Sequence, residues 1–302
     1  MSGATAVVVT HNSAGQIADC LTALQAAGVT IRVVDNASSD GTVCLVRRLF
    51  PAVELQAGSV NVGFARAVNR AAAGVTDEVI LLVNPDCVVP PATTRALLTF
   101  LAEYRSVGIA GPALVSPDGR PAVSAHPFET VTSVVVSRFG GALLPVRVRR
   151  RLGGRGGGPA ATSVDWLSGA CLAVRADLFH AIGGLDESYF LYYEDEELCL
   201  QARRRRFDVV HLPTVRASHI GGASSELGAT WPHLYRSMLI FFGRHRPAGY
   251  PVVRVVVLLR AVLGMGVGAA RRAGGGRTGS ARMLAWSRVA RIAWRGETVC
   301  AS

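Results

Sequence analysis

The chain has 302 residues, half of them apolar, and a formal net charge of +11 from 32 basic and 21 acidic residues. That apolar share is enough for a sizeable core and excludes global disorder. Every basic residue is Arg, and the excess lies at one end: residues 231–302 hold 12 Arg and one acid, whereas residues 1–230 hold 20 of each. Six scattered cysteines without a C-x-x-C pair favour reduced thiols in a cytosolic compartment.

Apolar runs and helical periodicity alternate from the N-terminus. The first residues lack the basic start and long apolar run of a signal peptide, and they predict a strand over 5–12. Such alternation is typical of a parallel, doubly wound α/β sheet, whose ligands lie at the carboxyl ends of the strands. The elements expected next are a helix over 13–28, a strand from 30 into a polar turn, a helix over 42–51, a strand over 53–58, a helix over 61–74 and a strand over 78–90.

Polar residues follow these strands and are expected to share one edge of the sheet. Asp35 comes straight after apolar residues, so it can accept a hydrogen bond from a pyrimidine ring, or it can form an Asx-turn or a helix cap. Asp40 lies in a D-G-T sequence that favours turn and cap chemistry. Gly63 lets the backbone approach a ligand at a helix N-terminus, which attracts phosphate. The other strand-end candidates are Thr10, Asn12, Asn36, Asn61 and Asn84.

Asp86 stands directly after the most apolar strand, in "LLVNPDCVVP". A carboxylate there is costly unless it is paired or bound to a cation. It can supply an oxygen ligand to Mg²⁺ or Mn²⁺, ions that usually bind through one or two carboxylates plus substrate phosphates. The alternative is an ordinary turn Asp at a strand end.

Four consecutive acids occur in "FLYYEDEELCLQARRRR", from Glu194 to Glu197. A helix N-terminus tolerates negative charge, so a solvated helix start accounts for Glu196 and Glu197. It does not account for Glu194 and Asp195, because the aromatic and apolar residues that precede them predict that these two acids are buried near the crevice. We therefore expect one of the first two acids to take a proton during a reaction.

The order of the motifs resembles a known family. "VVVTHN", "VVDNASSDGT", "NVGFARAVNR" and "NPDCVVP" precede "WLSGACLAVRADLFHAIGGLDESYFLYYEDEELCL" and "SHIGGASS". Over about residues 5–225 the chain is similar to family 2 glycosyltransferases of the GT-A fold, in particular bacterial rhamnosyltransferases that build cell-wall linkers and polysaccharides. The resemblance implies a nucleotide-sugar donor, a divalent metal and inversion at the anomeric carbon.

The resemblance also assigns roles to single residues. Asp35 matches the acid that contacts the donor base, and Thr10 and Asn12 match residues lining the nucleotide pocket. Asn84 replaces the first Asp of the family's D-x-D motif, so Asp86 alone should carry the carboxylate–metal contact. Asp195 matches the catalytic base, with Glu194 in a supporting contact, while Glu197 replaces the more frequent Asp of that helix. These matches are read from the motifs quoted above.

Three further features complete the expected site. His219 matches a late His that can complete the metal shell, which would favour Mn²⁺ over Mg²⁺; a lone His is otherwise structural. Trp166 can stack on the acceptor sugar or pack in the core. Ser168 and Gly169 form a small-residue turn beside it, on the expected acceptor side.

The domain organisation is predicted from composition. Residues 1–230 are expected to form the catalytic domain, with a nucleotide-sugar-binding half (1–110) and an acceptor-binding half (111–230) that contains a mobile loop (138–163). Residues 231–302 are expected to form a helical tail on an anionic membrane surface. Its alternatives are a hairpin packed on the catalytic domain or a single membrane span, although Arg254 and Arg260 interrupt the apolar run.

The sequence therefore predicts an inverting, metal-dependent glycosyltransferase on the cytoplasmic face of the plasma membrane. The expected donor is dTDP-L-rhamnose and the expected acceptor a polyprenyl-diphosphate-linked sugar. The alternatives are a UDP- or GDP-sugar donor, or a non-catalytic nucleotide-sugar or glycan-binding module. No nucleic-acid partner is expected, because no motif or row of stacking aromatics accompanies the basic tail. The sequence leaves the oligomeric state open.

Overall fold

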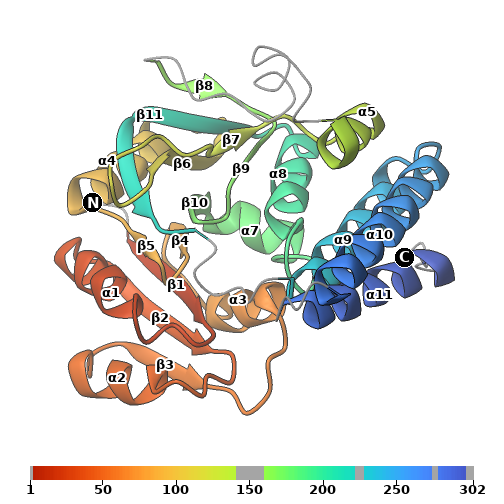
Figure 1. Ribbon diagram of the computed structural model, residues 1–302. Coiled ribbons are helices and arrows are strands. Elements are labelled where there is room, and N and C mark those ends of the chain that lie inside the picture. Colours follow the sequence, from red (N-terminus) through yellow and green to blue (C-terminus); the bar gives the residue numbers. More distant parts are fainter. Residues whose placement is uncertain (1–2, 141–159, 222–227, 274–277, 297–302) are drawn as a thin grey trace. The chain divides into compact units, whose positions relative to one another are not determined.

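The computed structural model describes residues 3–140, 160–221, 228–273 and 278–296 (Figure 1). The chain folds into two compact units. The predicted boundary at residue 230 and the predicted halves of the catalytic domain stay predictions. The first unit comprises Met1–Phe128, Gly153–Glu187 and Glu194–Ser224, and the second comprises Glu129–Leu152, Ser188–Tyr193 and Ser225–Ser302.

A nine-stranded sheet forms the centre of the first unit, with the order β3-β2-β1-β4-β10-β6-β11-β5 and with β8 paired to β11. β3, β2, β1 and β4 are parallel, as are β6 and β11, whereas β10 is antiparallel to both of its neighbours. The strands are β1 (Ala4–Thr10), β2 (Thr30–Asp35), β3 (Glu54–Ala57), β4 (Val79–Val83), β5 (Cys87–Val88), β6 (Val107–Val115), β8 (Thr162–Ser163), β10 (Cys171–Arg175) and β11 (Asp208–His219). A separate small sheet pairs β7 (Ala125–His126) with β9 (Trp166–Leu167).

Helices cover both faces of this sheet, and the composition of the central strands reflects it. β4 is apolar and buried throughout, with Leu81 packed in one cluster and Leu82 in the other. A strand buried on both faces needs apolar residues at every position. Helices α1 (Ile17–Ala26), α2 (Thr42–Leu49) and α4 (Pro91–Glu103) pack on one face, and α3 (Phe64–Ala72), α7 (Ala176–Ile182) and α8 (Glu194–Arg204) pack on the other.

The second unit is mainly helical in its described residues, apart from the turns and bends of Ser188–Tyr193. A short α5 (Val131–Val135) leads into a π-helical turn, η1 (Val136–Gly140), and three longer helices follow. α9 (Trp231–His245) carries the aromatic centre, with Phe241 and Phe242 fully buried. α10 (Tyr250–Ala273) and α11 (Gly279–Arg295) pack against α9 and along each other.

The predicted fold class is confirmed: a mostly parallel sheet lies between helical layers, and a helical extension follows it. The strand expected over 78–90 is interrupted, because a turn at 84–86 separates β4 from β5. β5 then pairs with β11 on the far side of the sheet. The mobile loop predicted over 138–163 falls mainly on residues 141–159, which lie outside the described residues.

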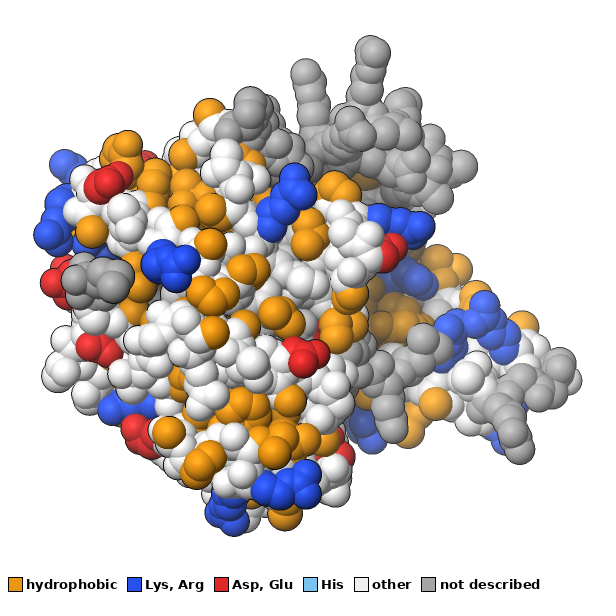
Figure 2. Space-filling view, turned by 90° about the vertical axis from the view of Figure 1, so that its left-hand side faces the viewer, with side chains coloured by type: hydrophobic (Ala, Val, Ile, Leu, Met, Phe, Trp, Pro, Cys, Tyr) orange, Lys and Arg blue, Asp and Glu red, His pale blue; other side chains and the backbone are white. Residues whose placement is uncertain are grey.

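Surface charge on the first unit follows its balanced composition. Figure 2 shows the side of this unit where α1 and α2 lie, with Arg, Asp and Glu side chains scattered among apolar and neutral ones. No patch of one sign gathers among the side chains described on that face. The basic excess belongs to residues 231–302.

Candidate active site

The carboxyl ends of β1 and β2 hold Asp35 in a fixed orientation. Thr10 and Asp35 are register partners, and the Thr10 hydroxyl donates to Asp35 Oδ1 over 2.8 Å. The Ser38 backbone N–H donates to the other oxygen over 2.9 Å. Both side chains are buried, so their orientation is set before a ligand arrives.

The turn that follows separates binding candidates from capping residues. Asp40 accepts hydrogen bonds from the Ala14 N–H and from Thr42 in the first turn of α2, which confirms its expected turn chemistry, while the N-cap residue of α2 is Gly41. Asn12 has a φ of 54°, a left-handed conformation that Asn tolerates better than most residues. Its side-chain oxygen accepts the Ser39 N–H over 2.8 Å, which ties the ends of the first two strands together.

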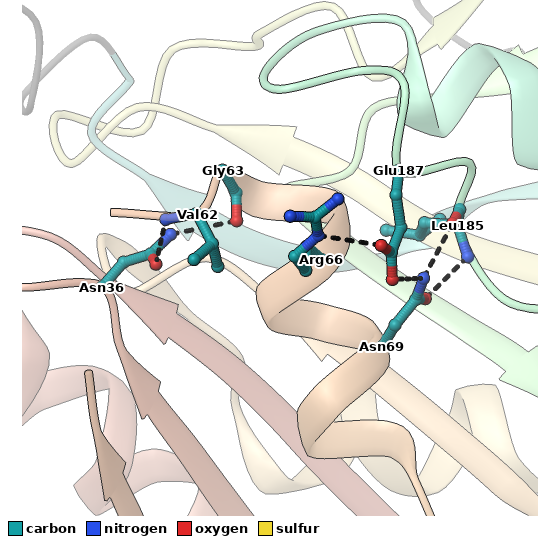
Figure 3. A network of polar contacts seen from close by, with 7 residues as sticks. All are labelled: Asn36, Val62, Gly63, Arg66, Asn69, Leu185 and Glu187. Carbon is teal, nitrogen blue, oxygen red and sulfur yellow. Dashed lines mark hydrogen bonds and ion pairs between the residues drawn. The ribbon is translucent and has the colours of Figure 1, made fainter. Parts of the chain in front are cut away.

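The N-terminus of α3 is anchored by Asn36, a strand-end residue that the sequence pattern also placed at this edge of the sheet. Its amide donates to the Gly63 carbonyl and accepts from the Val62 N–H, both over 3.0 Å (Figure 3). Asn61 accepts the Gly63 N–H, and Gly63 has a φ of 89°, which favours glycine. The signal for Asn36 was its place next to Asp35 at the end of a buried strand.

A second network joins α3 to the segment before the acid run. Arg66 donates to the Glu187 carboxylate over 2.8 Å, and Asn69 donates to the same carboxylate over 3.2 Å (Figure 3). Asn69 also exchanges two hydrogen bonds with the Leu185 backbone. More than 110 residues separate these partners in the sequence, so no local pattern could have revealed them.

Asp86 lies in the turn after β4, opposite His219 at the end of β11. The Asp86 Oδ1 to His219 Nε2 distance is 3.2 Å, and the Gly221 N–H donates to Oδ2 over 3.2 Å. Burial alone would raise the pKa of Asp86, but the hydrogen bond and charge of His219 bring it below its ordinary value of 3.8. Asp86 is therefore ionised at neutral pH and available to a cation.

The donor set fits a metal ion shared with a ligand. Among the described residues, no group of three or more His, Cys, Asp or Glu side chains could enclose an ion. Asp86 and His219 together offer carboxylate oxygen and imidazole nitrogen, a combination that suits Mn²⁺. The remaining ligands would come from water and substrate phosphates, as is common for such ions.

Asp195 is tied to the same edge of the sheet through the turn before β10. Its Oδ2 accepts the Gly169 N–H over 2.9 Å, and the next residue, Ala170, accepts the Asn84 N–H over 3.0 Å. Cys171 begins β10 opposite Val83, so the antiparallel strand starts where β4 ends. The fold thereby brings Asp195 and the Asn84–Asp86 turn to one side, although no hydrogen bond joins Asp86 and Asp195 among the side chains described.

Gly169 lies against the Asp195 side chain, and Ser168 precedes it in the same turn. A Cβ at position 169 would meet the Asp195 side chain at 3.4 Å, so this position lies in direct contact with the carboxylate. The Ser168 N–H donates to the Ser124 carbonyl over 2.9 Å, which fixes the turn. These contacts make the turn a support for Asp195, and its predicted role in acceptor binding stays a prediction.

The first turn of α8 is much more buried than expected. Glu196 is 2% exposed and Glu197 5% exposed, so the solvated helix start predicted for them is wrong. Gln201 donates to Glu197 over 2.8 Å one turn along the helix. The acids before the apolar residues of α8 are drawn into the protein because that helix packs on the sheet.

Glu194 and Asp195 form a coupled, protonatable pair. Burial, and then the charge of Asp195, raise the pKa of Glu194 well above 4.5, and burial raises the pKa of Asp195 against the opposing N–H donors of Gly169 and Glu196. Glu194 Oε2 is buried and has no hydrogen-bond partner among the described residues. The two residues before them, Tyr192 and Tyr193, have φ values of 70° and 71°, a strained backbone often found at functional sites.

Trp166 stacks on a protein side chain in this structure. Its ring lies parallel to His126 at a centroid distance of 4.1 Å, and its indole N–H donates to the Pro127 carbonyl over 3.0 Å. Burial lowers the pKa of His126 to about 4, so the imidazole is neutral at physiological pH. Trp166 is only half-buried, and its predicted contact with an acceptor sugar stays a prediction.

Comparison with known proteins identifies this architecture. The glycosyl transferase family 2 model matches residues 5–167, more than half of the chain. The fold is the GT-A fold of nucleotide-sugar-dependent glycosyltransferases. The chain belongs to glycosyl transferase family 2.

Individual relatives agree with this family. Over 208 residues the chain is 29% identical to the N-acetylglucosaminyl-diphospho-decaprenol L-rhamnosyltransferase of Mycobacterium tuberculosis, covering 63% of this chain and 66% of that protein, just under two thirds of its length. The structure of GalNAc-T7, solved with UDP, GalNAc and Mn²⁺, superposes with a TM-score of 0.59 at 14% sequence identity. The match covers 83% of this chain and 50% of the GalNAc-T7 chain. The mannosyltransferase PcManGT of Pyrobaculum calidifontis, solved with GDP-Man and Mn²⁺, superposes with a TM-score of 0.54 at 16% sequence identity. This match covers 95% of this chain and 85% of the PcManGT chain.

Proposed function

We propose that this chain is an inverting glycosyltransferase that transfers L-rhamnose from dTDP-L-rhamnose to a polyprenyl-diphosphate-linked sugar. The observation that carries the proposal is the convergence of three carboxylates from distant segments on one edge of a family 2 sheet. Asp35 ends β2, Asp86 follows β4, and Asp195 reaches the turn before β10. These positions suit recognition of the donor base, of its diphosphate and of the acceptor hydroxyl.

The donor side is built from prearranged groups. Asp35 accepts a hydrogen bond from the nucleobase, and Thr10 holds its carboxylate in place. Asn12 and Asn61 border the nucleotide from neighbouring turns, and Gly63 leaves the N-terminus of α3 open to the sugar phosphate. Asn84 completes the turn that presents Asp86.

The residues present would hold the metal through Asp86 and His219. A bound Mn²⁺ or Mg²⁺ would supply positive charge that stabilises the negative charge developing on the departing diphosphate. Asp86 and His219 lie within hydrogen-bonding distance of each other, so their orientation is set in advance. The likeness to two folds solved with Mn²⁺ supports this assignment.

Asp195 acts as the base. The acceptor hydroxyl oxygen forms a bond to C1 of the donor sugar on the face opposite the diphosphate, the C1–oxygen bond to the diphosphate breaks, and the hydroxyl proton passes to Asp195. One base and one cationic site are sufficient, because the diphosphate leaves without a proton. The raised pKa of the Glu194–Asp195 pair gives the carboxylate a stronger affinity for that proton.

The acceptor side and the cellular location follow from the relatives. The mycobacterial relative is named for a sugar carried on diphospho-decaprenol, which supports a polyprenyl-linked acceptor here. We assign acceptor binding to Trp166, Ser168 and Gly169, because Gly169 contacts Asp195 and the other two residues precede it closely in the chain. Because a lipid-linked acceptor lies in a membrane, we place the enzyme at the cytoplasmic face of the membrane and propose that it is attached peripherally.

A panel of nucleotide sugars tests donor and activity together. With Mn²⁺, dTDP-L-rhamnose should raise the melting temperature more than UDP- or GDP-sugars, because a ligand that binds only the folded state stabilises it, by about 2.7 kcal/mol at 100 times Kd. Product formation on a polyprenyl-diphosphate-linked N-acetylglucosamine, with the anomeric configuration read by NMR, checks transfer and inversion. A better-stabilising UDP- or GDP-sugar would change the donor and leave the reaction class intact.

The same panel distinguishes an enzyme from a binding module. A non-catalytic nucleotide-sugar or glycan-binding protein would be stabilised by the donor and yield no product with any acceptor. Two observations favour an enzyme over a binding module. Asp195 is held in place but only half-buried, and the backbone of the preceding Tyr192 and Tyr193 is strained. Stabilisation without turnover across the acceptor panel would overturn the proposal.

A further inference from the structure

The apolar helix α10 divides its surface between two environments. It is the one helix among the described residues that is long and apolar enough, by length and composition, to cross a membrane. Yet one side of it is buried within the second unit, where it packs against α9 and α11. The buried residues on this side are Val253, Val256, Val257, Ala261, Gly264 and Gly268.

The two arginines that interrupt its apolar run are engaged inside the helical pair. Arg254 donates to the backbone carbonyls of Ala293 and Trp294, over 2.6 and 2.5 Å, which stabilises the C-terminal end of α11. Arg260 lies over the indole ring of Trp286, 4.7 Å from its centroid. Both positions thus belong to the side of α10 that faces its partners.

The opposite side of α10 is a continuous apolar surface. Its side chains recur at spacings of three and four residues, which places them along one face of the helix. Each is between 48% and 58% exposed. Arg260 and Arg271 border this row, at spacings of three residues from Leu263 and four from Val267, respectively. This surface, called the α10 outer face below, consists of Val252, Val255, Leu259, Val262, Leu263 and Val267.

The charges around this face have one sign. Residues 228–296 contain no Asp or Glu. The adjacent helix α11 exposes Arg288, Arg291 and Arg295 at spacings of three and four, and Trp294 is 75% exposed at its end. Exposed Trp and Arg beside an apolar helix face are characteristic of segments that rest in the headgroup region of a bilayer.

We propose that the α10 outer face binds the surface of a bilayer containing anionic lipid, with α10 lying in the plane of the interface rather than crossing the membrane. A crossing helix would remove its buried side from α9 and α11 and carry Arg254 and Arg260 to membrane depth. A second copy of this chain is a poorer occupant, because its own excess of arginine would repel this one. The inference rests on the proposed function for its purpose, which is to hold the enzyme beside a lipid-linked acceptor.

The test compares two Leu→Asp variants at positions of matched exposure. Leu259 on the outer face is 53% exposed, and Leu49 at the end of α2 is 51% exposed. In flotation with vesicles containing about one third anionic lipid, the wild-type chain and Leu49→Asp should float equally, and Leu259→Asp should bind more weakly by about 10-fold. High salt or alkaline carbonate should release the wild-type chain, whereas a membrane-crossing helix would resist both.

Two controls check folding and bilayer contact independently of flotation. Circular dichroism checks that Leu259→Asp is folded, and Val262→Trp provides a second probe whose emission should shift to shorter wavelength on addition of anionic vesicles. Equal flotation of all variants, or no emission shift, would overturn the inference. A Leu259→Asp variant that only converts a dimer to a monomer would identify the face as a protein interface instead.

Failure of the membrane inference is distinguishable from failure of the proposed function. Leu259→Asp should keep the wild-type response to nucleotide sugars in thermal melts, because none of the residues assigned to donor binding lies on α10. Loss of flotation with retained donor binding supports both assignments. Flotation without any donor response leaves the membrane surface standing and refutes the sugar transfer.

Discussion

At the scale of single residues, the site keeps acids where burial disfavours their charge. Glu194 has a buried carboxylate oxygen without a hydrogen-bond partner among the described residues, and the charge of Asp195 lies next to it. Such an arrangement reduces stability at neutral pH and is retained where chemistry needs it. Glu194 and Asp195 are therefore better explained by a reaction than by stabilisation of the helix.

Stability should report this arrangement as pH rises. The folded state keeps a proton on Glu194 above pH 4.5, where the unfolded chain has released it, so folding loses stability between 4.5 and the raised pKa. Glu194→Gln removes this loss. Its melting temperature relative to the wild type should be higher at pH 8 than at pH 4.5, measured without ligand.

Glu187→Gln is the control of opposite sign. Hydrogen bonds from Asn69 and Arg66 hold the pKa of Glu187 below 4.5, so its contribution is present above that pH and is lost as pH falls through the lowered pKa. This variant should be less stable than the wild type at pH 8, with the difference shrinking in acid. A pH-independent difference for Glu194→Gln would contradict the assigned pKa shift.

At the scale of elements, sequence patterns located the strands and their polar ends but not their long-range partners. Asp35 and Asp86 could be predicted because each interrupts an apolar run at a strand end. The burial of Glu196 and Glu197 could not, since it depends on where α8 packs. Nor could the insertion of antiparallel β10 between β4 and β6, which places Gly169 against Asp195.

The packing partners of α10 could not be predicted from the sequence either, and two glycines of this helix test them. A Cβ at Gly264 would overlap the Trp286 ring, whereas no heavy atom lies within 4 Å of a Cβ at Gly266. Gly264→Ala should destabilise the second unit by about 1–3 kcal/mol through overpacking. Gly266→Ala should stabilise it by up to about 1 kcal/mol through helix propensity. Denaturant unfolding followed by tryptophan fluorescence measures both, and equal effects would refute the packing of α11 described here.

At the scale of the whole molecule, charge and chemistry are divided between segments. Residues 1–230 balance their acids and arginines and carry the candidate site, while residues 231–302 hold the entire basic excess. Composition alone could predict this division. It could not show that Arg254 and Arg260 are held within a helical pair, which is why a spanning helix, a packed hairpin and a surface helix were all compatible with the sequence.

The central claim is that Asp86 and Asp195 perform separate tasks at one edge of the sheet. The most direct measurement compares Mn²⁺-dependent donor binding with sugar transfer in Asp86→Asn and Asp195→Asn, using the exposed Asp118→Asn as a control. Asp195→Asn should bind donor like the wild type and lose sugar transfer by about 10²–10⁴-fold. Asp86→Asn should lose the Mn²⁺-dependent part of donor binding. Asp118→Asn should change neither donor binding nor sugar transfer. Wild-type transfer by Asp195→Asn, or undiminished Mn²⁺-dependent binding by Asp86→Asn, would contradict the account.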